Sequence, residues 1–400
     1  MASINGVHRV KQTSTIPSRL YSIDNTPSLS EFKLICSKTL NIDTYPLAHA
    51  VQCNIPIYDL SRFSLSDIDT IKTLQDEWYH ILLSSPGVFV LKNLMPCSII
   101  TSTNAAFDPT IKSEASSGAH RKGNHFSGGT NTRIWNSFSK HCLSDPSSFQ
   151  QYYSSPWLSL VSAAWLGPGH RITAQANIVR SGGSAQISHR DYHLGFQTAA
   201  TCAQFPAATH HATQLLTLQG AIAHSDMPPA SGPTRFLPFS QAFAQGYVAY
   251  RRADFDAFFR VHHVALPLAA GDAVFFNPGL HHAAGANAIA DVDRAANLLQ
   301  VSSALGKPME CVDSLPLVER TWDGLRGEYE RDGLSAEVKA FVAAVADGYP
   351  FPTNLDRRAP RMDGMAPESE QELLVRGLES GWTNEEVIRE LRILREDSKP

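Results

Sequence analysis

Two histidines and one aspartate have the residue types and the spacing of a ferrous-ion site. His189 and Asp191 flank Arg190, and His282 begins the distant segment HAAGAN. On an extended strand, residues i and i+2 project to the same side, so His189 and Asp191 can bind one metal while Arg190 points away. One carboxylate and two imidazoles can occupy one face of an octahedral Fe(II) ion, which leaves the opposite face open for a co-substrate and O2. This chemistry indicates an oxygenase.

Short strands, interrupted by glycine and proline, are predicted around these residues. Residues 171–180 alternate apolar and polar side chains and end at the turn 181–184, so the His-x-Asp pair follows a strand and a turn. The other predicted strands are 215–223, a returning strand within 226–240, 273–277 and 295–302. This pattern favours a β-sandwich or barrel of the jelly-roll type. We therefore predict a mainly β fold, with a double-stranded β-helix (cupin-like) core and with flanking and C-terminal α-helices.

The segments outside these strands are predicted from their periodicity and composition. They are a helix over 66–84, a strand over 87–92, a long polar loop over 102–145 near the cavity mouth, a helix over 149–166, and charged amphipathic helical stretches over 312–347 and 367–397. We predict three parts. They are an N-terminal tail and lead-in over 1–60, the oxygenase core over 61–310, and a helical extension over 311–400 that acts as a lid or a dimer surface.

The chain resembles the phytanoyl-CoA dioxygenase family of iron(II)/2-oxoglutarate oxygenases over roughly residues 85–305. The resemblance rests on motifs whose order and spacing are specific together. They are Gln186 three residues before His189, the His-x-Asp pair, the segment 226–240, Gly271-Asp272, the His-x-x-Gly-x-Asn pattern at 282–287, and Arg294 twelve residues after His282.

The resemblance implies a cofactor and two co-substrates. Fe(II) would be bound by His189, Asp191 and His282, and 2-oxoglutarate would chelate the ion through its C1 carboxylate and ketone. Arg294 would hold the distal carboxylate, because a planar guanidinium offers two parallel donors. With O2 as the second co-substrate, the family's chemistry yields succinate and CO2 and oxidises a C–H bond by hydroxylation, desaturation, ring closure or epoxidation.

Two further contacts and one departure follow from the same resemblance. Gln186 and Arg133 are implied as additional contacts to the co-substrate. Related enzymes often carry a threonine after an Asp-Met pair, but Pro228 stands at that position here. Any hydroxyl contact to the co-substrate must therefore come from elsewhere in the chain.

Two adjacent histidines compete for the third ligand position. His282 has the family's His-x-x-Gly-x-Asn register and the twelve-residue gap to Arg294, whereas His281 should face the opposite side of the strand. We therefore predict that His282 is the ligand.

The substrate is predicted to be a small molecule, since the sequence shows no basic patch for the phosphates of an acyl-CoA. The C-terminal extension, with its element Tyr349-Pro350-Phe351, resembles that of microbial family members and of fungal members that oxidise free branched-chain amino acids, including aziridine-forming ones. This favours such an amino acid in secondary metabolism, with a polycyclic natural product as the alternative. Tyr349, Phe351 and His193 are candidate substrate contacts, although His193 equally fits a packed structural histidine.

Composition excludes several classes of partner. A net charge of -4 and a pI near 6.5 give no general attraction to nucleic acid or to an anionic membrane. Six cysteines without Cys-x-x-Cys spacing suit free thiols in a reducing compartment, so we predict a cytoplasmic protein, possible as a homodimer. The first 23 residues lack Asp and Glu, which makes a mitochondrial presequence the alternative to a polar tail.

Two hypotheses from other classes keep the fold but change the function. A non-catalytic ligand-binding jelly roll need not retain Arg294 together with three metal ligands, and a cupin-type metal isomerase needs no 2-oxoglutarate pocket. The joint presence of these residues favours the oxygenase.

Overall fold

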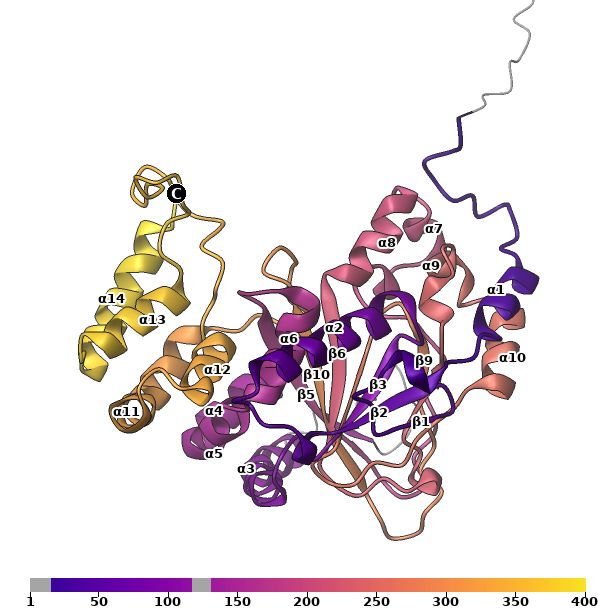
Figure 1. Cartoon of the computed structure of the whole chain (residues 1–400), viewed down its shortest axis with the longest axis horizontal. Helices are drawn as coiled ribbons and strands as arrows, with labels where there is room; N and C mark the ends of the chain where they lie inside the picture. Colours follow the sequence, from indigo (N-terminus) through magenta and orange to yellow (C-terminus); the bar gives the residue numbers. More distant parts are fainter. Residues whose placement is uncertain (1–15, 117–130) are drawn as a thin grey trace, which may run out of the picture.

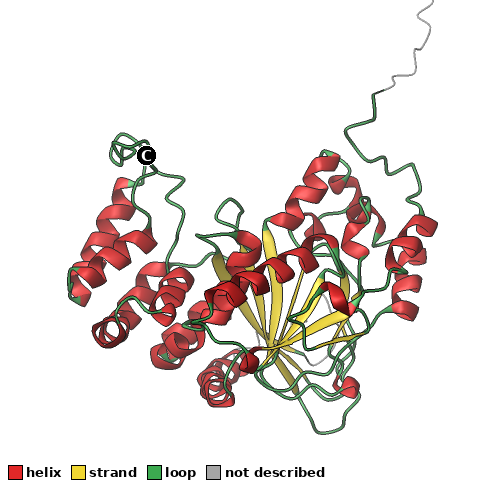
Figure 2. Cartoon of the chain, in the orientation of Figure 1, coloured by secondary structure: helices red, strands yellow, loops and turns green. Residues whose placement is uncertain are grey.

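The computed structural model describes residues 16–116 and 131–400. Within these ranges the strands form one mixed sheet of eight strands, in the order β1-β2-β3-β8-β6-β10-β5-β4, and a second sheet of two strands, β7-β9 (Figure 2). The large sheet contains β1 (Ala50–Gln52), β2 (Ile55–Asp59), β3 (Val88–Lys92), β4 (Thr132–Ile134), β5 (Arg171–Val179), β6 (Thr217–Ala223), β8 (Ala273–Phe276) and β10 (Arg294–Ser302). The small sheet contains β7 (Thr234–Leu237) and β9 (His281–Ala284). Strands β2 and β3 are parallel, and the other paired strands are antiparallel.

Strands β6, β10 and β5 are neighbours in the large sheet and are its longest strands. β10 pairs along its whole length with β5, from Arg294 opposite Val179 to Ser302 opposite Arg171, and it pairs with β6 on its other side. Because side chains alternate between the faces of a strand, one face of the sheet is apolar and the other carries polar groups. The core-facing side chains are Ile172, Ala174, Leu218, Ile222, Leu299 and Val301, all buried.

Helices cover the apolar face of the large sheet. Figure 1 shows α2 (Ile68–Ser84), α4 (Ser137–Ser144), α5 (Pro146–Tyr153) and α6 (Pro156–Leu166) on this side. They bury one hydrophobic cluster against the sheet, with Trp78, Phe149 and Leu299 among its members. The remaining helices before residue 310 are α1 (Leu29–Cys36), α3 (Cys97–Ser116), α7 (Ala199–Cys202), α8 (Ala207–Leu215), α9 (Gly246–Ala249) and α10 (Ala253–His262).

Two predictions about local structure were wrong. The segment 149–166 contains two helices rather than one, because Pro156 begins α6 and the Ser155 hydroxyl caps it by accepting from Leu158 N. The predicted loop over 102–145 contains most of α3, strand β4 and helix α4. Its residues 117–130 lie outside the described part of the chain. Serine and threonine concealed α3 in the sequence, whereas burial of Ile100 and Phe107 stabilises it in the fold.

The chain beyond residue 310 is helical, as the sequence predicted. It forms α11 (Ser314–Asp332), α12 (Ala336–Val345), α13 (Glu370–Glu379) and α14 (Asn384–Asp397). In Figure 1, α11 and α12 lie beside α4 and α5, and α13 and α14 lie farthest from the sheet. Trp322 and Phe341 belong to the same buried cluster as the sheet residues, so these helices extend the core. In the described ranges, the helices are all too short or too polar to cross a membrane.

Candidate metal centre and its pocket

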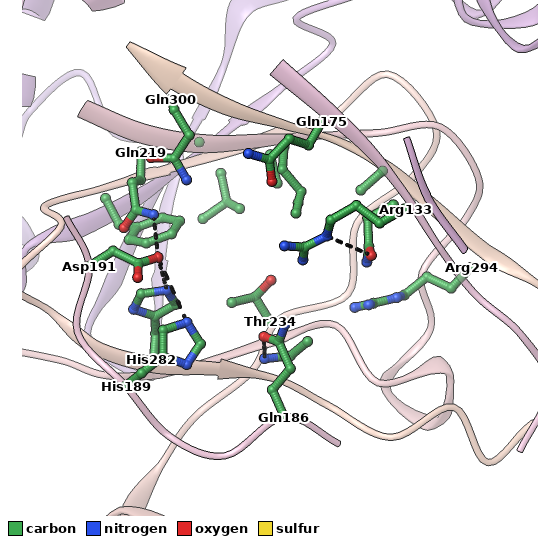
Figure 3. A pocket seen from close by; sticks show the side chains of 18 of the residues that line it. Arg133, Gln175, Gln186, His189, Asp191, Gln219, Thr234, His282, Arg294 and Gln300 are labelled. Atoms are coloured by element: carbon green, nitrogen blue, oxygen red, sulfur yellow. Dashed lines mark hydrogen bonds and ion pairs between the residues drawn. The ribbon is translucent and has the colours of Figure 1, made fainter. Parts of the chain in front are cut away.

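His189, Asp191 and His282 meet between two segments of extended chain. His189 and His282 form an isolated antiparallel bridge, in which each backbone N–H donates to the other residue's carbonyl over 2.9 Å. The Nε2 atoms of His189 and His282 each lie 3.7 Å from Asp191 Oδ2. One ligand atom from each residue lies within 4.8 Å of the other two (Figure 3). Among the described residues, this is the group of three His, Cys, Asp or Glu side chains that is suited to a metal ion.

Backbone carbonyls orient both imidazoles. His189 Nδ1 lies 2.8 Å from Ile187 O, and His282 Nδ1 lies 2.9 Å from Leu280 O. A carbonyl can only accept, so each Nδ1 carries the proton and each Nε2 keeps a lone pair for a metal. Burial, followed by the neighbouring His189, lowers the pKa of His282 to about 4, so His282 is neutral near pH 7. A neutral imidazole is the form that binds metal ions.

The carboxylate of Asp191 is held from outside the group. Its Oδ2 accepts a hydrogen bond of 2.8 Å from Gln219 Nε2 on β6, and its backbone carbonyl accepts one of 2.8 Å from the Tyr247 hydroxyl. Hydrogen bonds of this kind orient the ligands of metal sites. Two imidazoles and a carboxylate in this arrangement fit an Fe(II) ion with open coordination positions.

The three side chains lie at one end of a cavity that both sheets line. The polar face of the large sheet forms one wall, through Arg133, Gln175, Asn177, Gln219, Gln300 and Arg294. The small sheet and the segments before it supply Gln186, Thr234 and Ala284. Apolar side chains complete the lining, among them Phe196, Met227, Leu268, Val274, Phe276, Leu298 and Met309.

Arg294 enters the cavity from the first position of β10. It is 4% exposed, and its Nη1 donates to the carbonyl of Gly232. Burial lowers the pKa of Arg294 to about 10, so the guanidinium stays charged at neutral pH. Its Nε is buried without a hydrogen-bond partner among the described residues. A buried cation with an unpaired N–H favours an anionic ligand, and the distal carboxylate of 2-oxoglutarate fits this requirement.

The approach of two loops places the Gly232 carbonyl beside Arg294. Gly232 has a φ of +73°, and a Cβ atom there would lie 2.2 Å from Ala286 O. A Cβ on Gly285 would lie 2.7 Å from Gly232 Cα, so glycine is required on both sides of this contact. Asn287 fixes the same turn by donating to the carbonyls of Val179 and Val292. In the His-x-x-Gly-x-Asn pattern, the glycine and the asparagine therefore shape the turn, and the histidine is the candidate metal ligand.

Gln186 and Arg133, the other two predicted co-substrate contacts, also line the cavity. Gln186 Oε1 accepts from Ala284 N over 3.0 Å, which fixes the amide at the edge of the small sheet. Arg133 projects from β4 and is half-buried, with Nε 3.5 Å from Asn177 Oδ1 and its guanidinium 5.2 Å from the Trp135 ring. Burial lowers the pKa of Arg133 to about 10, against the opposing effect of Asp191 and Glu310.

Four other residues singled out from the sequence lie outside this cavity lining. His281 is completely buried against Phe259, with ring centroids 4.9 Å apart. His193 lies near Thr213 and Lys307, with Nδ1 3.1 Å from the Thr213 hydroxyl. Tyr349 and Phe351 contact each other, with ring centroids 5.5 Å apart, and are 37% and 38% exposed. The structure therefore brings His282, but none of these four residues, to the lining of the metal pocket.

Several lining residues were not singled out from the sequence. Gln175, Asn177, Gln219 and Gln300 lie on strands whose existence was predicted. Their two-residue alternation with apolar neighbours was the available signal, but it does not tell which face meets a cavity. Thr234 lines the cavity two residues after Gly232, and it gives the pocket the hydroxyl group that Pro228 cannot provide.

A second surface hollow also reaches the metal group. His189 and Asp191 line it together with Arg251, Asp256 and Arg260. The same two candidate ligands therefore border two separate hollows of the molecule.

Comparison with known proteins gives a family and distant structural similarities. The family model described as phytanoyl-CoA dioxygenase (PhyH) matches residues 83–296. The carbocyclase SnoK from nogalamycin biosynthesis, described as non-heme and α-ketoglutarate dependent, is 18% identical with a TM-score of 0.41, covering 58% of this chain and 86% of its own. The epimerase SnoN from the same biosynthesis is 13% identical with a TM-score of 0.37, covering 60% and 84%. AviO1 from Streptomyces viridochromogenes Tue57 is 14% identical with a TM-score of 0.42, covering 58% and 97%.

A search of curated proteins found no match. The family model spans more than half of the sequence and includes His189, Asp191, His282 and Arg294 within its limits. This chain therefore belongs to the phytanoyl-CoA dioxygenase family.

Proposed function

We propose that this protein is an Fe(II)- and 2-oxoglutarate-dependent oxygenase that oxidises an unactivated C–H bond of a small molecule. The observation that carries the proposal is the meeting, in one cavity, of the His189, Asp191 and His282 group with the unpaired Nε of Arg294. A metal-dependent isomerase would need the metal group but would have no use for a buried arginine that binds 2-oxoglutarate. Family membership supports the same chemistry.

His189, Asp191 and His282 would hold Fe(II) through Nε2, a carboxylate oxygen and Nε2. When bound with 2-oxoglutarate and O2, the iron supplies the oxidant that removes hydrogen from the substrate, and 2-oxoglutarate leaves as succinate and CO2. The protein's part is to hold the ligands in place and to exclude water. Gln219 keeps the Asp191 carboxylate oriented, and the apolar side chains of Phe276 and Val274 limit solvent in the pocket.

Arg294 and Thr234 would bind the distal carboxylate of 2-oxoglutarate. The Arg294 guanidinium is anchored by the Gly232 carbonyl, and Thr234 follows that glycine by two residues on β7. A charged donor and a hydroxyl donor that line the same cavity suit the two oxygens of a carboxylate. Gln186, at the edge of the small sheet, would be the further contact to the co-substrate.

The finer parts of the proposal concern fold and substrate. The large and small sheets together line the cavity, which supports a jelly-roll core over residues 61–310 with the helical extension over 311–400.

The preferred substrate is a free branched-chain amino acid, oxidised by hydroxylation, desaturation or ring closure such as aziridine formation. A lining that combines polar and apolar side chains supports a substrate that has both characters.

The test is to measure O2 uptake and succinate formation by the purified protein with Fe(II) and 2-oxoglutarate, in the absence and presence of branched-chain amino acids. We expect slow succinate formation without substrate and faster, O2-coupled formation with substrate. Omission of iron or the substitution His282→Ala should abolish succinate formation both without and with substrate. A protein that binds metal but forms no succinate under any of these conditions would instead be a cupin-type isomerase or a non-catalytic binding protein.

A further inference from the structure

The cavity holds two arginines, and one 2-oxoglutarate accounts for only one of them. Arg294 lies on the central strand β10 and is 4% exposed, whereas Arg133 lies on the edge strand β4 and is half-buried. Next to Arg133, Trp135 is 41% exposed, so this part of the wall borders the solvent.

The two arginines also differ in their relation to the metal group. Burial lowers the pKa of both arginines, but Asp191 opposes this lowering at Arg133, whereas burial is the one cause at Arg294. Arg133 therefore lies within electrostatic range of the metal group. A co-substrate that chelates the metal at one end presents its distal carboxylate away from the metal. Arg294 suits that carboxylate, and Arg133 suits a different anion. Figure 3 shows the Arg133 guanidinium pointing into the centre of the cavity.

Polar side chains of β5 lie beside the Arg133 guanidinium. Asn177 lies directly opposite it in the β4–β5 register, and its Oδ1 faces Arg133 Nε. Gln175, two residues along the same face of β5, donates to the sulfur of Met309 at 3.3 Å and also interacts with the Glu310 carboxyl. A thioether is a weak acceptor, so a carboxylate would bind this N–H better. Glu310, the other nearby acid, already accepts from Asn136 N over 2.7 Å.

Hydrogen-bond acceptors lie farther along the same wall. Gln219 and Gln300 are opposite each other in the β6–β10 register, and both are buried. Their Oε1 atoms have no hydrogen-bond partner among the described residues. An unpaired buried acceptor costs free energy that a donating ligand group would recover. The wall thus runs from the donating guanidinium of Arg133 to the accepting amide oxygens of Gln219 and Gln300. Of these two residues, Gln219 contacts the Asp191 carboxylate.

We propose that Arg133 binds the carboxylate of a small zwitterionic substrate, and that the amide oxygens of Gln219 and Gln300 accept hydrogen bonds from its amino group. This inference rests on the proposed function and revises the assignment of Arg133 to the co-substrate. The apolar side chains of Leu298 and Phe276 then contact the aliphatic part of the substrate. Arg133 is the residue that selects an acid over a neutral analogue of the same shape.

The test measures binding without turnover. The full chain, loaded with Fe(II) and 2-oxoglutarate in the absence of O2, is titrated with L-valine, L-leucine and L-isoleucine. L-valinamide, which lacks the carboxylate, and 3-methylbutanoate, which lacks the amino group, are titrated alongside. Binding is followed by calorimetry and by the change in the charge-transfer absorption of the iron complex. The variants are Arg133→Met, Arg133→Lys and, as a matched control, Arg180→Met, whose half-buried arginine pairs with Asp293 outside the cavity lining.

We expect at least one of the three amino acids to bind the unsubstituted protein more tightly than valinamide and 3-methylbutanoate do. Arg133→Met should weaken amino-acid binding by at least about 30-fold, as for the loss of one partner of a buried charged pair. Its affinity for 2-oxoglutarate should stay close to that of Arg180→Met, and Arg133→Lys should recover part of the amino-acid affinity.

Three results would overturn the inference. In the first, Arg133→Met weakens 2-oxoglutarate binding and leaves amino-acid binding unchanged, which returns Arg133 to the co-substrate. In the second, valinamide binds as tightly as valine. In the third, the iron and 2-oxoglutarate complex forms but responds to none of the amino acids. Failure of the unsubstituted protein to bind 2-oxoglutarate at all is a separate result, and it would refute the proposed function itself.

Discussion

His281 and His282 are neighbours in the sequence but have opposite environments. The His282 ring lies in the cavity with its Nδ1 held by Leu280 O, whereas His281 is packed among aromatic rings with both ring nitrogens unpaired among the described residues. The difference follows from strand β9, on which successive side chains point to opposite faces. The sequence pattern alone therefore identified which of the two histidines faces the cavity.

The first prediction compares these two histidines. His282→Ala should abolish stoichiometric Fe(II) binding, because it removes one of three ligand atoms. His281→Leu, which places an apolar side chain in this buried position, should retain Fe(II) binding. Fe(II) content after anaerobic loading and gel filtration measures the effect. Loss of iron from the His281 variant, with retention in the His282 variant, would contradict the ligand assignment.

The second prediction concerns Arg294. Replacing it with Met leaves the Gly232 carbonyl unpaired and removes the cation proposed to bind 2-oxoglutarate. Loss of one partner of a buried charged pair costs roughly 2–5 kcal/mol, so the apparent KM for 2-oxoglutarate should rise by at least about 30-fold. The steady-state rate of succinate formation at varied 2-oxoglutarate concentration measures this KM, with Arg180→Met as the control. An unchanged KM would assign the distal carboxylate to another residue.

At the scale of secondary structure, periodicity predicted the central strands well. Residues 171–180, 215–223 and 295–302 correspond to β5, β6 and β10, because each strand alternates between a helix-covered face and a cavity face. The same alternation could not reveal that Gln219 supports Asp191. That contact depends on the approach of a segment distant in sequence. Helix α3 was missed because its stability comes from tertiary burial rather than from helix propensity.

The C-terminal helices were predicted as elements, but their position was not predictable. Leu317 and Trp322 on α11 and Phe341 on α12 pack into the cluster that also contains Phe149 and Leu299. Amphipathic spacing identifies a buried face without identifying the surface that covers it. The structure places this face against the helices of the core. A role of Tyr349 and Phe351 in substrate binding stays a prediction that the cavity lining does not support.

The third prediction tests this packing. Trp322 is completely buried, and its Nε1 donates to Trp382 O over 2.9 Å. Trp322→Ala should lower the free energy of unfolding by about 3–5 kcal/mol, the usual cost of removing a large core aromatic side chain. Urea denaturation measures the loss, with the exposed Leu305→Ala as control. Fe(II) binding at low temperature should be unchanged, because the metal group lies across the sheet from this helix. A loss below about 1 kcal/mol would mean that α11 adds little to the core.

At the scale of the whole molecule, buried histidines make stability depend on pH, and His224 and His141 are two of them. Burial lowers the pKa of His224 to about 3, with a further contribution from His141, and lowers that of His141 to about 4. Each ring is hydrogen-bonded in its buried position, His224 Nε2 with the Tyr152 hydroxyl at 3.0 Å and His141 Nε2 with the Ser148 hydroxyl at 2.8 Å. The folded protein therefore holds both rings neutral at pH values where the unfolded chain protonates them.

The fourth prediction follows from that difference in bound protons. The stabilising contribution of both histidines is complete above the unfolded pKa of about 6.5, and it falls as the pH drops toward about 4. Each should contribute a slope of up to about 1 kcal/mol per pH unit within this window. Urea denaturation between pH 7 and pH 4.5 measures the slope, and His224→Gln should make it shallower. An equal slope in the variant would assign the acid sensitivity to other groups.

The two hollows that border His189 and Asp191 have a consequence for the exchange of the metal. A site reached only through the substrate cavity would trap its iron whenever substrate filled that cavity. Here the second hollow, lined by Arg251, Asp256 and Arg260, gives the same two ligands a separate border with solvent. A substrate in the cavity should therefore leave this second border of His189 and Asp191 open to solvent. The retention of iron during turnover then depends on how tightly the three protein ligands and the chelating 2-oxoglutarate bind it, and a substrate that fills the cavity would not close the second border.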